Sequence, residues 1–309
     1  MPNTPTLFLV WKGVNDNQIW MTQPNNLQVP FPEQAQLPAN NASTSSRPAI
    51  ITFGDQIIVA FEQPNTGILS CAWNYQQANS GWLNPIGVLG GSGTSWAPAM
   101  ALFRNTVIMV WPGVGSDTRI WCSLYDPATN QFQNQYLTVL GPKYGLGPIK
   151  SGSTPAIVNW NGTLLMVWRG EGSNDNLYFS FSTDGVNWSD QGQIVGAAST
   201  IAPALTIWQG RPYLVFRGGT NDDAIHGTFY EGEPGGTTWI YGDEASLGQM
   251  GTSDGPSIAV FNGNLFMTWK GVAGDTTQYW SQAAPNSGFT GQSVIPNTGS
   301  SVGPSVTVY

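Results

Sequence analysis

A small set of polar and aromatic residues recurs along the 309-residue chain. Four stretches place a basic residue before Gly, then a loop containing Asp, then an aromatic residue or His. They are Lys12, Asp16 and Trp20; Arg169, Asp175 and Tyr178; Arg217, Asp222 and His226; and Lys270, Asp275 and Tyr279. A variant stretch after Pro112-Gly113 carries Asp117, Arg119 and Trp121, and a sixth stretch with Glu62, Asn65 and Leu69 has lost the pattern.

These residue types suit the recognition of a sugar. Charged side chains form short, strong hydrogen bonds with ring hydroxyls, and an aromatic face packs against the apolar C–H side of a pyranose. A structural explanation stays open for each stretch: the cation and the Asp can pair across an exposed loop for ~0–1 kcal/mol, and the ring can belong to the core. The exchange of Trp, Tyr and His at one position favours a binding site, because a core position favours apolar volume.

Few residues are left for catalysis. His226 is the single histidine, so a Ser-His-Asp triad would need it, and a histidine-rich metal site cannot form. Glycosidases need two carboxyl groups flanking the bond that they cleave, and none of the six glutamates lies in a motif for that role. We therefore expect no covalent chemistry, no metal and no cofactor. Cys71 and Cys122 are expected to be small apolar core residues.

The elements that position these stretches follow from a repeat of Pro before a small residue. The six prolines are Pro48, Pro98, Pro155, Pro203, Pro256 and Pro304, with separations of 50, 57, 48, 53 and 48 residues. In the first five units an aromatic residue lies 13 positions after the proline, at Phe61, Trp111, Trp168, Phe216 and Trp269. A fixed interval inside a variable period indicates a rigid unit with variable loops outside it.

Each unit has the pattern of four strands. Residues 156–160 and 164–168 are apolar strands joined at Asn161-Gly162, which is typical of a tight hairpin, and Gln209-Gly210 and Asn262-Gly263 lie at the same place. A third strand follows a polar loop. One aromatic residue per unit is expected to mark the fourth strand: Phe31, Trp82, Phe132, Trp188, Trp239 and Phe289. Four strands in ~50 residues, repeated without a helix, predict a β-propeller blade.

The two ends of the chain predict how the ring closes. Residues 304–309 form only the first strand of a unit, and residues 7–13 form the second. We therefore predict an all-β, six-bladed propeller of four-stranded blades, with one domain over residues 1–309 and with the C-terminal strand paired to the N-terminal strands. The loop between strands two and three then shares a face with the connection between blades, where Ser45, Ser95, Thr200, Ser253 and Ser301 lie three residues before their prolines.

Two resemblances accompany this prediction. Residues 182–188, Ser-Thr-Asp-Gly-Val-Asn-Trp, resemble the Asp-box of sialidase-type propellers shortened by one residue, and the resemblance implies a structural turn. The Phe-Arg-Ile-Pro element of sialidases is absent. Over its whole length the chain resembles the six-bladed propeller lectins, such as the fungal fucose-binding family, which hold a sugar between blades with Arg, Glu and aromatic residues. The resemblance implies a multivalent carbohydrate-binding protein with about four to five sites for glycans or glycoconjugates, although Lys or Arg with Asp replaces the family's pair here.

Composition limits the partners further. The formal charge of −8 repels phosphate backbones and anionic lipids, so we expect no nucleic-acid partner and no direct membrane insertion. The apolar run at residues 7–11 has no basic residues before it, which predicts no secretory signal and a location in the cytoplasm or export without a leader. Two alternatives stay open: an enzyme that uses the central channel or one asymmetric pocket, and a protein-interaction platform.

Overall fold

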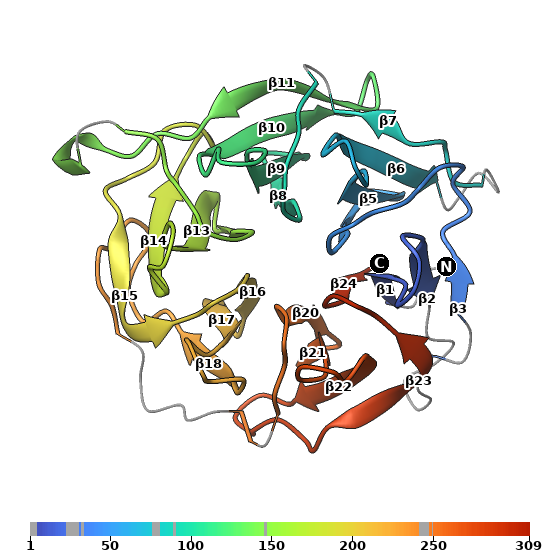
Figure 1. The fold of residues 1–309 in the computed structure, drawn as a ribbon. Coiled ribbons are helices and arrows are strands. Elements are labelled where there is room, and N and C mark those ends of the chain that lie inside the picture. The colour runs from blue at the N-terminus through green and yellow to red at the C-terminus, as the bar shows by residue number, and fades with distance from the viewer. Residues whose placement is uncertain are drawn as a thin grey trace.

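The fold is a ring of six β-sheets (Figure 1). The structure is a computed structural model that describes residues 5–22, 31, 34–75, 81–88, 91–144, 147–240, 247–248 and 250–309. Blade one contains β24 (Ser305–Val308), β1 (Leu7–Lys12), β2 (Ile19–Thr22) and β3 (Gln34–Gln36). Blade two contains β4 (Ala49–Phe53), β5 (Gln56–Glu62), β6 (Leu69–Tyr75) and β7 (Ile86–Gly87). Blade three contains β8 (Ala99–Phe103), β9 (Thr106–Pro112), β10 (Ile120–Asp126) and β11 (Gln131–Leu137).

The other three blades complete the ring. Blade four contains β12 (Ala156–Trp160), β13 (Thr163–Arg169), β14 (Asn176–Ser182), β15 (Gly192–Ala198) and, as a fifth strand, β19 (Trp239–Ile240). Blade five contains β16 (Ala204–Trp208), β17 (Arg211–Arg217) and β18 (Ile225–Phe229). Blade six contains β20 (Ser257–Phe261), β21 (Asn264–Lys270), β22 (Thr277–Ala283) and β23 (Ser293–Gly299). A 3-10 turn, Pro142–Tyr144, follows β11.

The ring closes as the sequence predicts. C-terminal β24 pairs antiparallel with N-terminal β1, with Leu9 opposite Val306. The inner strands β24, β4, β8, β12, β16 and β20 stand around the centre, and each contacts the next one around the ring (Figure 1). Pairing of the two termini within one sheet removes the two open edges that a linear array of blades would leave.

Local sequence explains the inner hairpins. Each repeat proline directly precedes an inner strand, as Pro155 precedes β12, and proline at that point leaves no missing donor inside the sheet. The turn Asn161-Gly162 has positive φ at both residues, 52° and 85°, and Asn262-Gly263 has 49° and 79°. Positive φ at both central positions defines the type I′ turn, which Asn-Gly adopts readily and which matches the twist of the strands.

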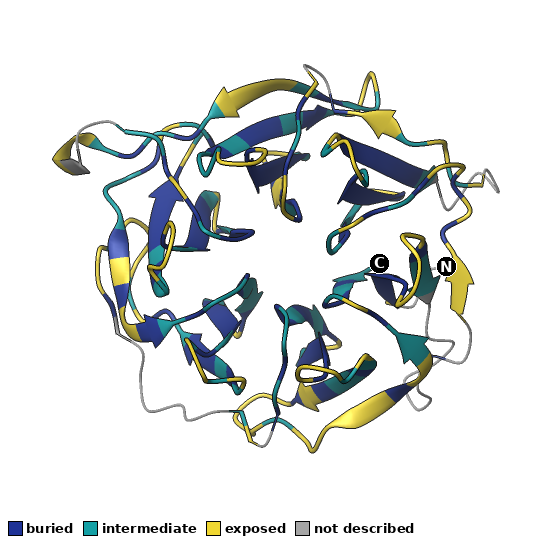
Figure 2. Ribbon diagram, viewed as in Figure 1, coloured by how far each residue is buried: buried dark blue, intermediate teal, exposed yellow. Residues whose placement is uncertain are grey.

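The core lies between neighbouring sheets: the second strand of each blade is buried, the inner strands are partly buried and the outer strands are largely exposed (Figure 2). The six aromatics expected to mark fourth strands each join a different one of six hydrophobic clusters. Their position was predicted wrongly in all but Phe132: Phe31, Trp82, Trp188 and Phe289 precede the outer strand of their blade. A large ring there wedges into the space between two sheets instead of pairing in a ladder.

Blade five departs from the predicted four strands. Its sheet has three strands among the described residues, and Trp239, expected in its fourth strand, lies in β19, which pairs in parallel with β15 of blade four. Trp239 is 2% exposed and contacts Phe179 and Tyr230, with ring centroids 5.6 Å and 5.1 Å away. Burial of this ring against blade four carries the chain away from β18.

Cys71 and Cys122 are free, buried and placed on the third strands of blades two and three, as expected. Burial raises the pKa of Cys71, and it raises the pKa of Cys122 to about 12. Both thiols are therefore protonated and unreactive at neutral pH. No helix in the described part of the chain has the length and apolar character needed to cross a membrane.

Candidate functional site

The predicted third-strand rings share one structural position. Each lies opposite the aromatic residue of the second strand: Trp20 opposite Trp11, Trp121 opposite Trp111, Tyr178 opposite Trp168, His226 opposite Phe216 and Tyr279 opposite Trp269. In blade two the same position holds Ser70, opposite Phe61. Three of these pairs are stacked, with centroids 6.3 Å, 5.4 Å and 6.0 Å apart in blades four, five and six. The inner ring is buried and the outer ring is half-buried, so each stack links the core to the loop face.

A loop acid bonds the polar edge of most of these rings. Asp275 accepts a hydrogen bond from the Tyr279 hydroxyl at 2.9 Å, and Asp117 accepts one from Trp121 Nε1 at 3.1 Å. Asp222 Oδ2 lies 2.8 Å from His226 Nε2. In each case the acid precedes the ring by four residues, so the loop length fixes the pair.

The glycine after the cation makes this turn possible. A β-carbon on Gly271 would lie 2.2 Å from Asp275 Oδ2, and one on Gly218 would lie 2.2 Å from Asp222 Oδ2. Any larger residue would displace the carboxylate from the ring. The glycine of each basic-Gly pair is thus a steric requirement of the acid-ring pair.

The two lysines are buried, and their donors are directed to protein oxygens. Lys12 is 8% exposed, and its ammonium donates to the carbonyls of Gly13 at 3.2 Å and Asp16 at 2.9 Å and to Ser301 at 2.9 Å. Lys270 is 6% exposed and donates to Ser253 at 2.8 Å and to the carbonyl of Gly271 at 3.3 Å. Burial lowers the pKa of Lys12, although Asp16 opposes this shift. Both lysines hold the loop against the connection that leads into their own blade.

The arginines pair with loop carboxylates. Arg169 Nη2 lies 2.7 Å from Asp175 Oδ1, and Arg119 Nε lies 2.7 Å from Asp117 Oδ1. Arg217 pairs with Asp223, one residue after the predicted Asp222. The sequence predicted one loop acid for both roles, whereas in blades four and five two adjacent residues share them. The first residue bonds the ring, and the following residue pairs with the arginine.

Sequence reasoning missed Asn174 and Asp223 for this reason. Asn174 takes the ring-bonding place in blade four and donates to the Tyr178 hydroxyl at 3.0 Å, while the predicted Asp175 serves the arginine. Both positions lie next to a predicted one in the loop. A fixed spacing of four residues before the ring was the signal that could have found Asn174.

The predicted hydroxyls meet the loops on one face, as expected. Ser301 and Ser253 bond the lysines, Thr200 bonds Arg217, Ser45 bonds Glu62, and Ser95 accepts from the Gly115 N–H at 2.7 Å. Each of these contacts joins residues of the same blade. Neighbouring blades also touch: Thr220 donates to Asp175 at 2.9 Å, and Thr118 donates to Glu171 at 2.8 Å.

The ring-bonding carboxylates are ionised at neutral pH. The hydrogen bond from Arg119 is the main cause that lowers the pKa of Asp117. Burial opposes ionisation of Asp275, but hydrogen bonds from Thr277 and Tyr279 outweigh it, so the pKa is lowered. The pKa of Asp222 is also lowered: burial opposes its ionisation, but hydrogen bonds from Ala224 and His226 outweigh the effect of burial. The Asp222 side chain is 47% exposed. This face therefore presents fixed anionic acceptors beside half-buried rings.

The Asp-box-like turn is structural, as predicted. Asp184 Oδ1 accepts from the N–H groups of Val186 at 2.8 Å and Asn187 at 2.7 Å. Trp188 Nε1 donates to the carbonyl of Gly185 at 3.0 Å, and its ring is 3% exposed in the cluster between blades three and four. The turn thus fixes a wedge between two sheets.

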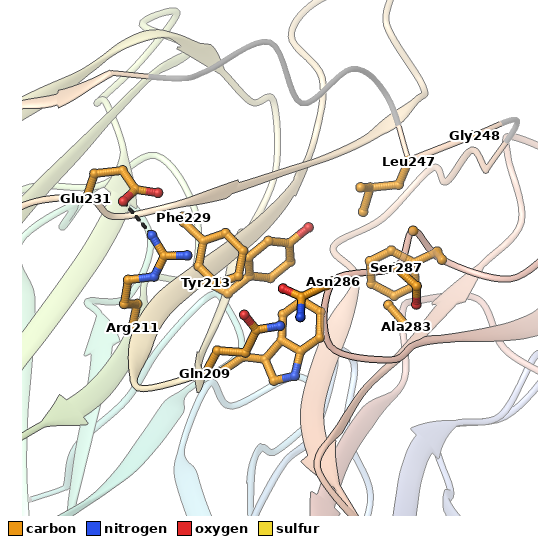
Figure 3. Close-up of a pocket in the computed structure, with 13 residues that line it drawn as sticks. Gln209, Arg211, Tyr213, Phe229, Glu231, Leu247, Gly248, Ala283, Asn286 and Ser287 are labelled. Carbon is orange, nitrogen blue, oxygen red and sulfur yellow. Dashed lines mark hydrogen bonds and ion pairs between the residues drawn. The ribbon is translucent and has the colours of Figure 1, made fainter.

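A pocket of about 600 Å³ lies between blades five and six. Its lining includes the inner-hairpin turn residue Gln209 and residues 286–289 after the third strand of blade six, so it lies on the opposite face from the loops between strands two and three. Figure 3 shows the side chains that line it. Trp208 and Phe229 stack at 5.7 Å and 14°, and the Arg211 guanidinium lies 4.3 Å from the centroid of Phe229. Arg211 also pairs with Glu231 at the rim (Figure 3). The repeat in the sequence does not predict this pocket, because the pocket depends on the displacement of β19 from blade five to blade four.

The displaced outer strand explains where the pocket forms. In blades four and six, Ser180 and Ser281 donate to the outer segment of their own blade, at the carbonyls of Ser189 and Thr290. The corresponding Thr228 of blade five donates to the carbonyl of its neighbour Phe229 at 3.3 Å. Trp239 pairs with blade four, and among the described residues no fourth strand of blade five covers Phe229, which lines the pocket instead.

Solved structures share this fold at low sequence identity. A mutant of AofleA from Arthrobotrys oligospora has a TM-score of 0.65 at 9% identity, over 98% of this chain and 85% of that one. A mutant of the Aleuria aurantia lectin in complex with Fucα1-6GlcNAc has a TM-score of 0.60 at 14% identity, over 94% and 92%. An α-L-arabinofuranosidase from Clostridium thermocellum has a TM-score of 0.53 at 12% identity, over 82% and 94%.

These likenesses establish the fold. No protein-family model matches the sequence, and no curated protein matches it. The chain is thus a six-bladed propeller whose fold occurs both in lectins and in glycosidases.

Proposed function

We propose that this protein is a multivalent carbohydrate-binding protein whose sites are the acid-ring pairs of the loop face. The observation that carries the proposal is the recurrence of an ionised carboxylate beside a half-buried ring at one structural position, as in Asp275 and Tyr279. Ionised carboxylates accept hydrogen bonds from sugar hydroxyls, and a ring fixed by stacking needs no reordering when a pyranose binds. The sugar-bound lectin of the same fold supports this choice.

The geometry refines which predicted residues contact the ligand. Because the donors of Lys12 and Lys270 are directed to protein oxygens, these lysines position the loop. Half-exposed groups, such as Asp222 and Arg119, are available to a ligand. Several weak sites on one ring would bind a glycan-coated surface with avidity gains of ~10²–10⁴.

The pocket between blades five and six supports binding better than hydrolysis. Its described lining contains one carboxylate, Glu231, which pairs with Arg211. A glycosidase of the usual kind needs two carboxyl groups flanking the bond. Its aromatic floor suits a ring-shaped ligand, and the loop-face proposal does not depend on it.

The test is a broad glycan array with labelled protein and a competing free sugar, followed by titration calorimetry of the best ligand. Trp121→Ala, His226→Ala and Tyr279→Ala, which each remove the ring of one acid-ring pair, should each lower the number of sites by one. Tyr136→Ala, which removes a 44% exposed tyrosine from outer strand β11, should leave the number unchanged. An array without competable binding, obtained with folded protein, would contradict the proposal.

A further inference from the structure

A second pocket lies at the centre of the ring, on the loop face. The connections that lead into the six inner strands converge there, and residues one to three positions before the repeat prolines enclose about 250 Å³. At ~30 Å³ for each water molecule, this is the space of roughly eight waters, enough for one pyranose ring. The lining departs from sixfold symmetry: blade two contributes Arg47, blade three contributes Trp96 and blade six contributes Asp254.

Arg47 has unused donors in this pocket. Its Nη1 donates to the carbonyls of Gly255 at 2.9 Å and Pro256 at 3.0 Å, which fixes the guanidinium across the ring from blade two to blade six. No carboxylate of the described residues lies within ion-pair distance of it. Nε and Nη2 have no partner among the described residues. Burial lowers the pKa of Arg47, although Asp254 opposes this shift, so the cation is incompletely compensated.

Asp254 faces the backbone instead of the arginine. Its Oδ1 accepts from the Gly255 N–H at 2.7 Å, and its Oδ2 accepts from the Gly303 N–H. Gly255 has no room for a side chain, because a β-carbon would lie 2.6 Å from the Ala202 carbonyl oxygen and 2.8 Å from Arg47 Nη1. The acid therefore organises two connections and leaves the guanidinium free to bind another anion.

Two serine hydroxyls in the same lining have no partner. The Oγ atoms of Ser46 and Ser153 are buried and make no hydrogen bond, and Ser153 is 1% exposed. A buried hydroxyl without a hydrogen-bond partner destabilises the protein. After rotation about χ1, each serine hydroxyl can form a hydrogen bond with a hydroxyl or carboxylate of a ligand. Beside them Trp96 keeps 42% of its surface exposed, which is unusual for so large an apolar ring.

We propose that this central pocket binds one carboxylated monosaccharide, such as a hexuronate. The carboxylate meets the free edge of Arg47, hydroxyls meet Ser46 and Ser153, and the C–H face of the sugar ring packs on Trp96. A planar guanidinium pairs with a carboxylate through two parallel hydrogen bonds, which a neutral sugar cannot reproduce. The site is independent of the loop-face rings.

The test is titration calorimetry with glucuronate, glucose and acetate as probes. Glucuronate should bind at one site per chain, with at least about tenfold higher affinity than glucose, because a charged hydrogen-bonded contact is lost with the neutral sugar. Acetate should also bind at least about tenfold more weakly, because it lacks the ring that contacts Trp96. Equal affinity for either probe, or no heat with glucuronate, overturns the proposal.

Variants separate the binding from the folding of this region. Arg47→Gln, which keeps a donor for Gly255, should lower the affinity for glucuronate at least about tenfold, and Trp96→Ala should also weaken it. Ser46→Ala with Ser153→Ala should raise the melting temperature and weaken binding, since these hydroxyls have no partner in the free protein. Trp20→Ala and Tyr279→Ala should leave glucuronate binding intact. If they abolish it while the protein remains folded, the ligand binds the loop face and the central assignment is wrong.

Discussion

Tyr279 separates the structural role of the third-strand ring from its proposed binding role. The ring stacks on buried Trp269 with centroids 6.0 Å apart, and the hydroxyl donates to ionised Asp275 at 2.9 Å. Tyr279→Phe removes only the hydrogen bond to a charged group, and because the pair is partly solvated we expect a loss of about 1 kcal/mol in the free energy of unfolding. Tyr279→Ala also removes the stacking, worth ~0.5–1.5 kcal/mol, and the buried ring surface, so we expect about 2.5–4 kcal/mol in total.

Urea denaturation, followed by tryptophan fluorescence and circular dichroism, measures both losses. Tyr136→Ala is the matched control and should stay within ~0.5 kcal/mol of the wild type, because its ring is exposed on β11. For binding, Tyr279→Phe should keep the ring and retain the site with reduced affinity, whereas Tyr279→Ala should lose it. Equal stability losses in the two variants would refute the stacking argument, and unchanged binding in Tyr279→Ala would refute the assignment of the ring to a site.

Three further predictions concern the loops. Asp184→Ala should lower the free energy of unfolding by about 2 kcal/mol, because two backbone N–H groups and the Asn187 amide lose their acceptor; scanning calorimetry would show an unchanged melting temperature if the turn were not structural. Lowering the pH from 6 to 3 should destabilise the protein, because Asp117, Asp184, Asp222 and Asp275 have lowered pKa values in the fold: their contribution is complete above the unfolded value near 3.8 and is lost as the pH falls through the folded values. Urea titrations across this range that show constant or rising stability would contradict that sign. Gly152→Ser should be destabilising, because a β-carbon would lie 2.1 Å from Arg169 Nη1; adding Arg169→Lys should recover part of the loss by recreating the Lys-Ser contact of blades one and six, and a double-mutant cycle with a coupling below ~0.5 kcal/mol would disprove the steric link.

Inner hairpins and ring closure were predictable because local chemistry determines them. Proline before the inner strand and Asn-Gly at the turn each allow few backbone conformations, so their interval identifies the hairpin without knowledge of its neighbours. The position of the hydroxyl three residues before five of the six prolines was predictable for the same reason. Ser301 precedes β24. Because β24 pairs antiparallel with β1, Ser301 lies on the same face as the loop that follows β1, and the Lys12 ammonium donates to it at 2.9 Å.

The outer strands and loop roles were less predictable, because tertiary contacts determine them. Trp239 follows the second-strand aromatic of its unit, Phe216, by 23 residues, whereas the interval is 20 or 21 residues in the other five blades. Contacts with Phe179 and Tyr230 direct it to blade four. The adjacent acids Asp222 and Asp223 have different partners because the turn directs their side chains differently: Asp222 contacts His226, and Asp223 pairs with Arg217. A one-residue ambiguity in a loop therefore exchanges the partner of a ring with the partner of an arginine.

Symmetry gives different information at the rim and at the axis of this ring. At the rim, blades are far enough apart for each to carry a cation and an acid, so recurrence there is compatible with either structure or binding. At the axis, six equivalent charges would face one another within a small volume of low polarity, so a single arginine is expected on electrostatic grounds alone. The presence of Arg47 is therefore weak evidence of a site. Its unused donors and the unpartnered hydroxyls of Ser46 and Ser153 are stronger evidence, because a purely structural role for these groups would leave their desolvation uncompensated.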